Sequence, residues 1–166
     1  MKNEDDLQSL SADLSSFIGS LKGHQSILLP DGSIYIIGGC SSKSGVLNKQ
    51  GDKDAASTAL TYTSSLLRFD AESHTISHNK LPSMNQPRGF FTAILTQNLR
   101  YIYVIGGLTN GATRSGSRNQ PGSEHHPALS TALDSIEKYD TFSQKWQLVA
   151  PMKTSKGMHA ACQMIM

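Results

Sequence analysis

The stretch SIYIIGG (Ser33–Gly39) decides the fold, because it returns later in the chain as YIYVIGG (Tyr101–Gly107). A shift of 68 positions lays the two apolar runs and the two Gly-Gly pairs on each other. Runs of β-branched and aromatic residues favour a largely buried strand. Paired glycines at a strand end allow a positive φ and a close approach of backbones. Each stretch therefore predicts a buried strand that ends at a crowded corner.

The similarity continues downstream of both glycine pairs. SLLRFD (Ser65–Asp70) parallels SIEKYD (Ser135–Asp140), and both end in an aromatic residue followed by an aspartate. Such an aspartate suits a tight turn, because its side chain accepts hydrogen bonds from backbone amides just ahead. The aligned pairs are Gly38 with Gly106, Gly39 with Gly107, Phe69 with Tyr139, Asp70 with Asp140, Ile76 with Trp146, Met84 with Met152, and Arg88 with Lys156. Features shared in the same order indicate a tandem repeat.

Each of the two repeat units is expected to form four antiparallel strands. The expected strands are 25–29, 33–38, 64–70 and 74–79 in the first unit, and 90–96, 100–106, 134–140 and 144–149 in the second. A single four-stranded sheet leaves both of its faces open, whereas units packed around a common axis cover one another's faces. The sequence therefore predicts an all-β protein built from repeated four-stranded units.

The order of aliphatic strand, double glycine, Tyr-Asp, Trp and Pro-x-Met-like close resembles the kelch repeat, over roughly residues 21–166. The resemblance implies a partial β-propeller of four-stranded antiparallel kelch blades. Its parts would be blade 1 (23–87), blade 2 (88–155) and the first strand of an incomplete third blade (156–166). Two features depart from the family: Phe69 and Ile76 replace the tyrosine and tryptophan, and the period of 68 exceeds the ~50 residues of a kelch unit.

A complete propeller has about 4 to 8 blades. We therefore expect the chain to be a fragment of a longer protein, with self-assembly into a ring as the alternative. Residues 1–22 allow two interpretations. Apolar residues between Leu7 and Leu21 recur at helical spacing and predict an amphipathic helix that caps the open side of blade 1. The rival interpretation makes SSFIGSL (Ser15–Leu21) an outer strand of a preceding blade.

Composition sets limits on function. The 166 residues carry 15 basic and 13 acidic side chains, and these are scattered, so neither nucleic acid nor a membrane is an expected partner. Cys40 and Cys162 fit no metal-ligand or redox spacing. The acidic N-terminus has no apolar run behind it, which argues against a secretory signal and favours a cytoplasmic protein.

The extra length of each unit lies between the double glycine and the third strand, at residues 40–63 and 108–132. The second insertion, rich in Gly, Ser, Asn and Pro, is expected to be largely disordered by itself. Neutral drift and partner binding both explain such loops. Because antiparallel strands alternate in direction, both insertions share a face with the turns between units, where kelch proteins commonly hold ligands. The candidate partner-binding residues are Ser41, Lys43, Asn85, Gln86, Arg88, Arg114, Arg118, Lys153, Ser155 and Lys156.

Within this set, Arg88 and Lys156 are the main candidates for contacts with an anionic group, and solvated loop charge is the alternative for each. The pair His125-His126 has no further ligand at metal-binding spacing, so we expect no metal, no cofactor and no catalytic residue. The leading hypothesis is a protein-interaction module, since kelch propellers often act in ubiquitin-ligase or cytoskeletal assemblies. The alternatives are a piece of a kelch-propeller enzyme (copper oxidase-like or acting on sialic acids) and a degenerate fragment.

Overall fold

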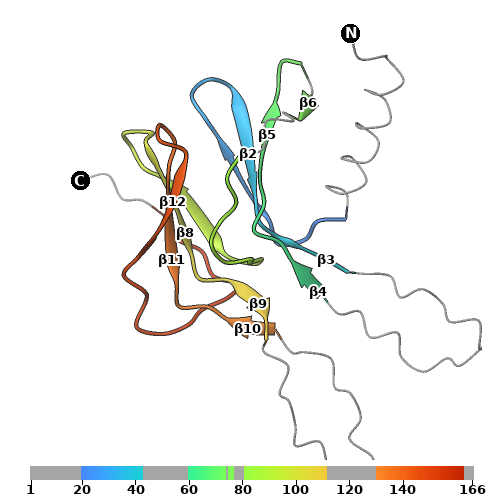
Figure 1. Cartoon of the computed structure of the whole chain (residues 1–166), viewed down its shortest axis with the longest axis vertical. Coiled ribbons are helices and arrows are strands. Elements are labelled where there is room, and N and C mark those ends of the chain that lie inside the picture. Colours follow the sequence, from blue (N-terminus) through green and yellow to red (C-terminus); the bar gives the residue numbers. More distant parts are fainter. Residues whose placement is uncertain (1–19, 43–59, 74, 77–80, 112–129, 163–166) are drawn as a thin grey trace, which may run out of the picture.

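The computed structural model describes residues 20–42, 60–73, 75–76, 81–111 and 130–162, and this part of the chain is all-β. It contains two antiparallel four-stranded sheets and two antiparallel two-stranded ribbons (Figure 1). The described residues include no helix. The helix or strand expected within residues 1–22 falls almost wholly outside them.

The first sheet has the strand order β1-β2-β5-β6. Its strands are β1 (Gln25–Leu28), β2 (Ser33–Ile37), β5 (Leu66–Asp70) and β6 (Thr75–Ile76). The second sheet has the order β7-β8-β11-β12. Its strands are β7 (Thr92–Leu95), β8 (Tyr101–Ile105), β11 (Ile136–Asp140) and β12 (Lys145–Val149). All eight strands expected from the sequence are therefore present.

The two sheets share one register of pairing. Ile37 pairs with Leu66 in the first sheet, and the equivalent Ile105 pairs with Ile136 in the second. The strands β5 and β11 begin two residues later than expected. The reason is that the residue before each strand bonds to the first glycine of a Gly-Gly pair. The Ser65 carbonyl accepts from the Gly38 N–H at 2.9 Å, and the Ser135 carbonyl accepts from the Gly106 N–H at 3.0 Å.

The insertions contain structure that the sequence did not suggest. β3 (Cys40–Ser42) pairs with β4 (Leu60–Tyr62), and β9 (Leu108–Asn110) pairs with β10 (Ser130–Ala132). Each ribbon begins directly after a double glycine. Backbone pairing therefore joins the first and last residues of each insertion at its base. The remainder of each insertion lies outside the described residues.

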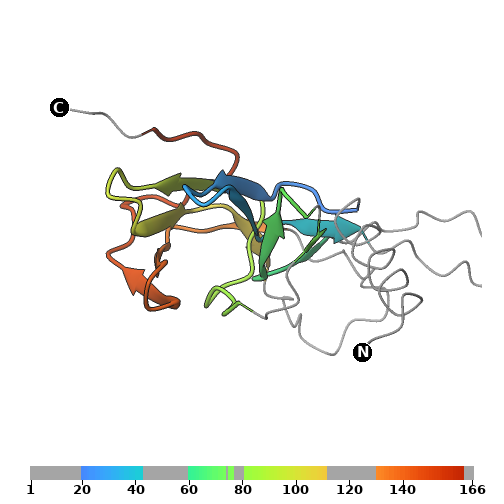
Figure 2. The ribbon, with the colours of Figure 1, turned by 90° about the horizontal axis from the view of Figure 1, so that it is seen from above.

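The core lies between the two sheets. One face of the first sheet, with Ile27, Tyr35, Ile37 and Leu66, packs against the face of the second sheet that carries Ile102, Val104 and Tyr139. The rings of Tyr35 and Tyr139 meet edge to face at 6.1 Å, a favourable aromatic geometry. The first strands of the sheets, β1 and β7, lie next to each other, and the other strands fan out from them (Figure 2).

Candidate functional site

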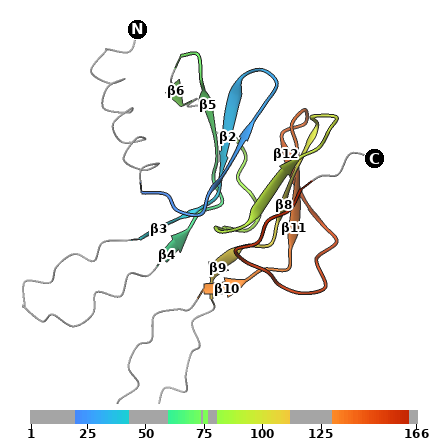
Figure 3. The same cartoon turned by 180° about the vertical axis from the view of Figure 1, so that it is seen from behind.

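The molecule has two edges of different character. At one edge, called the turn edge, short hairpins such as those at Leu29–Ser33 and Asp140–Gln144 join neighbouring strands. At the other edge, called the loop face, lie both ribbons and the two connections that leave the sheets, 81–91 after the first sheet and 150–158 after the second. Figures 1 and 3 show both ribbons projecting from this same edge. The insertions and the connections were expected to share one face, and the described residues of both do so.

The two ribbons contact each other across the unit boundary. The Tyr62 hydroxyl of β4 donates a hydrogen bond to the Ser130 hydroxyl of β10 at 2.7 Å. Tyr62 is only 5% exposed. Gly89 lies under its ring, where an added Cβ would come within 3.2 Å of the ring carbons. The base of the first insertion is therefore fixed against the base of the second.

The glycine pairs form the corners from which the ribbons start. Gly38 has φ 56° and Gly106 has φ 60°, values that glycine adopts without strain. A Cβ on Gly38 would lie 2.6 Å from the Arg88 carbonyl oxygen, and one on Gly106 would lie 2.5 Å from the Lys156 carbonyl oxygen. Gly39 and Gly107 donate their N–H groups to those two carbonyls, each at 2.8 Å. The glycines therefore let each connection lie directly on the corner.

The sequence suggested that Arg88 contacts a ligand on the loop face. This prediction is wrong, because the side chain of Arg88 is fully buried. Its guanidinium forms an ion pair with Glu137 at 2.7 Å and donates to the Gly106 carbonyl at 2.8 Å. Burial lowers the pKa of the Arg88 guanidinium, and the neighbouring carboxylate opposes that change. A residue of the first connection is thus inserted into the second unit.

Glu137 also accepts hydrogen bonds from other residues of this connection. Its carboxylate accepts from the Asn85 N–H at 2.7 Å, from the Asn85 side-chain amide at 2.9 Å and from the Gln86 N–H at 3.0 Å. Gln86 Oε1 accepts in turn from the Ser135 hydroxyl at 2.5 Å. The group formed by Asn85, Gln86, Arg88, Ser135 and Glu137 is called the clamp. Asn85 and Gln86, predicted as binding residues, therefore hold the two units together, although Asn85 remains exposed.

The other predicted binding residues have three different positions. Lys153, Ser155 and Lys156 are exposed on the second connection, and Ser41 is half-buried on β3. Lys43, Arg114 and Arg118 lie outside the described residues. Lys156 occupies the repeat position of Arg88, yet its side chain is exposed because the described chain places no third sheet against it.

The predicted motif residues at the turn edge have structural roles. Asp70 Oδ1 accepts from the N–H groups of Glu72 and Ser73, and Asp140 Oδ1 accepts from those of Phe142 and Ser143. Both are the tight turns expected from the sequence. A hydrogen bond from Arg100 lowers the pKa of Asp140 to about 2, assisted by the turn amides.

Tyr139 and Trp146 complete the core of the second sheet. Their ring centroids are 4.9 Å apart, and the indole N–H donates to the Pro82 carbonyl at 2.8 Å. Burial raises the pKa of the Tyr139 phenol. The motif tryptophan thus ties the second sheet to the connection that leaves the first.

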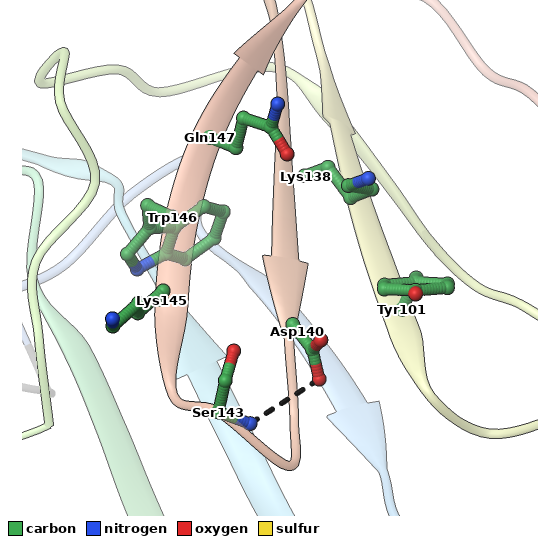
Figure 4. A pocket seen from close by; sticks show the side chains of 7 residues that line it. All are labelled: Tyr101, Lys138, Asp140, Ser143, Lys145, Trp146 and Gln147. Carbon is green, nitrogen blue, oxygen red and sulfur yellow. Dashed lines mark hydrogen bonds between the residues drawn. The ribbon is translucent and has the colours of Figure 1, made fainter.

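A shallow cavity of about 390 Å³ lies at the turn edge of the second sheet (Figure 4). Its lining residues are Tyr101, Lys138, Asp140, Ser143, Lys145, Trp146 and Gln147. The Lys138 ammonium lies 4.8 Å from the centre of the Tyr101 ring, and Asp140 is paired with Arg100 at 3.0 Å. Lys138 and Asp140 are thus engaged by Tyr101 and Arg100, and the lining residues show no nucleophile-base pair.

Three further observations concern metal binding, the thiol of Cys40 and the crossing of a membrane. Within the described ranges, no group of three His, Cys, Asp or Glu side chains is placed to hold a metal ion. Cys40 is fully buried, and burial raises the pKa of its thiol. In the part of the chain that the structure describes, no helix has the length and apolar character needed to cross a membrane.

Comparison with known proteins gives a fold but no family. No protein-family model matches the chain, and no curated protein matches it. Among solved structures, the chain is similar to the structure of YjhT, with a TM-score of 0.56 and 13% sequence identity. The similarity covers 84% of this chain and 35% of that chain, so this sequence spans about a third of YjhT. At this identity the similarity indicates a shared fold alone.

Proposed function

We propose that the chain is part of a kelch-type β-propeller, its two sheets being blades, and that it binds a protein or peptide through the loop face. The repeated register of the sheets and the repeated glycine corners support the blade interpretation. The similarity in fold to YjhT is compatible with it. The binding role follows from how the loop face is built.

One observation carries the binding proposal: the hydrogen bond between Tyr62 and Ser130 holds the bases of both insertions side by side. Residues 43–59 and 112–129 therefore leave the sheets from one fixed platform. Loops on a rigid base are where binding function concentrates, because the scaffold limits the ordering that binding requires. The clamp adds to this rigidity by fixing the connection next to the ribbons.

The charge of the loop face favours an acidic partner. Residues 43–59 contain three lysines and two aspartates, and residues 112–129 contain two arginines and one glutamate. Lys153 and Lys156 add exposed positive charge from the second connection. A cationic surface steers an acidic segment toward it and makes the encounter sensitive to salt. We therefore favour an acidic peptide segment as the ligand.

The test compares partner sets recovered from cells by quantitative mass spectrometry. Three versions of the protein are used: wild type, a version in which short Gly-Ser linkers replace residues 43–59 and 112–129, and a point variant, K153E. The proposal predicts that one set of partners is lost from the linker version and weakened by K153E. The ribbons remain in the linker version, so the sheets are left unchanged.

The matched control is K145E, which reverses one exposed lysine at the turn edge. Its partner set is expected to equal that of the wild type. Equal partner sets for all four proteins would overturn the proposal, and so would a loss caused by K145E alone.

A further inference from the structure

The middle of the first connection forms an exposed arch on the loop face. The arch is defined as residues 85–87, in which Asn85 and Pro87 are exposed and Gln86 is half-buried. It lies between the two units and is described at both of its ends. The arch therefore belongs to the surface that is proposed to bind a partner.

The first unit holds both ends of the arch. The Met84 N–H donates to the Ser64 carbonyl at 2.9 Å, and the Arg88 N–H donates to the Thr63 carbonyl at 3.1 Å. Thr63 directly follows β4, and the residue after Arg88 pairs with the start of β9. The arch therefore connects the base of the first insertion to the base of the second.

The second unit holds the middle of the arch through one carboxylate. Glu137 Oε2 accepts from the N–H and the side-chain amide of Asn85, at 2.7 and 2.9 Å. Glu137 Oε1 accepts from the Gln86 N–H at 3.0 Å and from the Arg88 guanidinium at 2.7 Å. Hydrogen bonds to an ionised acceptor are stronger than bonds between neutral groups. The arch and Arg88 thus form a receptor for one carboxylate.

The receptor offers only donors, and this sets what it accepts. A glutamine at position 137 keeps the shape of the side chain but replaces one oxygen by an NH₂ group, which only donates. Whichever way that amide turns, its NH₂ group faces two donors, either both groups of Asn85 or those of Gln86 and Arg88. The receptor therefore selects an ionised carboxylate over a neutral side chain of the same size.

The ion pair with Arg88 accounts for only part of what Glu137 does. The guanidinium also donates to the carbonyls of Gly106 and Ser135, at 2.8 and 3.2 Å. Three of the four hydrogen bonds that Glu137 accepts come instead from Asn85 and Gln86. The carboxylate is thus placed mainly to order the arch.

We propose that Glu137 is a positioning residue of the loop face, whose carboxylate fixes the arch in the shape that a partner recognises. Glu137 is fully buried, so it acts through the arch and not by direct contact. Its contribution is preorganisation, because a loop that is already ordered loses less conformational entropy when a partner binds. This inference rests on the proposed function, since the arch is taken as part of the binding surface.

The test removes the carboxylate from the 166-residue chain and returns it as a small molecule. E137A deletes the side-chain atoms beyond Cβ, which correspond to acetate. Hydrogen exchange followed by NMR compares the amides of Asn85 and Gln86 with those of β8 and β11. In E137A and E137Q the two arch amides are expected to exchange at least about tenfold faster relative to the strand amides, because they lose bonds to a charged acceptor.

Acetate is expected to slow the exchange of the arch amides in E137A, whereas the same concentration of chloride has no such effect. E137Q is expected not to respond to acetate, because its side chain fills the receptor. Circular dichroism shows whether each variant is folded, and E137Q alone carries the comparison if E137A is not.

The matched control is I27A, which creates a cavity in β1 away from the connection. It lowers stability without touching the receptor, so the exchange of the arch amides relative to the strand amides is expected to equal that of the wild type. Recovery of partners from cells, corrected for the amount of folded protein, gives the functional readout. E137Q is expected to recover several-fold less of the partners that the Gly-Ser linker version loses, and I27A as much as the wild type.

Unchanged relative exchange of the arch amides in the folded variants overturns the inference, as does an equal loss of partners in I27A and E137Q. Faster exchange with undiminished recovery also overturns it, because the arch then lies outside the binding surface. Partners that survive the linker version overturn the proposed function and this inference with it. The exchange measurement distinguishes the two failures, because it shows whether Glu137 orders the arch without reference to any partner.

Discussion

The two units share one backbone plan but differ in how they are held. Each has four strands in the same order, a glycine corner and an aspartate turn. The second unit has Tyr139, Trp146 and Glu137 where the first has Phe69, Ile76 and Leu67. The shared backbone features therefore define the repeat. The side chains at these three positions differ because in the second unit they contact the first unit or the connection that leaves it. Among the described residues, the clamp exists only where a neighbouring connection supplies Arg88.

The clamp is the largest structural difference between the two units. Removing the carboxylate of Glu137 from it tests how much the clamp stabilises the fold. In E137A the guanidinium of Arg88 stays buried without its carboxylate, and breaking a buried pair in this way costs about 3–5 kcal/mol. Urea unfolding followed by fluorescence of Trp146 measures the change. L67A, at the equivalent position of the first sheet, is expected to cost less, since it strands no charge. A loss for E137A of under about 1 kcal/mol would contradict the role given to the clamp.

We expect substitution of the first glycine of either Gly-Gly pair to destabilise the fold to a similar extent in both units. G38A combines a positive φ with a contact of 2.6 Å to the Arg88 carbonyl, and we expect a loss of about 3 kcal/mol. G32A provides the matched control, because it also has a positive φ but no atom lies near its added Cβ. It is expected to cost about 1 kcal/mol. Equal losses for G38A and G32A would show that the close approach to the connection is unimportant.

The aromatic packing of the second sheet is expected to exceed that of the first. W146A removes the ring contact with Tyr139 and the hydrogen bond to Pro82, for an expected loss of about 2–3 kcal/mol. I76A, at the equivalent but weakly packed position, is expected to lose about 1 kcal/mol. Thermal unfolding ranks the two. A larger loss for I76A would reverse the comparison.

The smallest effect concerns pH and the two turn aspartates. Arg100, together with the Phe142 and Ser143 amides, lowers the pKa of folded Asp140 from 3.8 to about 2, so the carboxylate stabilises the fold above pH 3.8 and loses this contribution as the pH falls toward 2. R100Q is expected to make the free energy of unfolding less dependent on pH in that range. Asp70 keeps its lowered pKa in this variant, because the Ser73 and Glu72 amides hold it. An NMR titration of both carboxyls gives the answer, and an unchanged Asp140 in R100Q would contradict the assignment to Arg100.

The strands were predictable because their signal is local. Alternation, β-branched residues and the Gly-Gly corners follow from neighbouring positions, so all eight sheet strands were expected within a few residues. The ribbons were missed because Cys40–Ser42 and Leu60–Tyr62 are short and weakly apolar, and their pairing depends on the corner that precedes them.

The site was less predictable because burial depends on the partner unit. Arg88 was expected to face a ligand since its loop position looked exposed, and only the packing of the second sheet buries it. Glu137 was missed, although a signal existed: it stands between Ile136 and Lys138 in a strand whose inward positions are otherwise apolar. A carboxylate at such a position predicts a buried basic side chain that pairs with it. Tyr62 and Ser130 had no comparable signal in the sequence.

The most direct test of the loop face is photo-crosslinking from two positions in the protein in its own cells. A photoreactive amino acid replaces Lys153, which is exposed on the loop face, or Phe142, which is 79% exposed at the turn edge. The account predicts that a protein or peptide partner is captured from position 153 and that position 142 captures none. Capture of the same partner from position 142, with none from position 153, would contradict it.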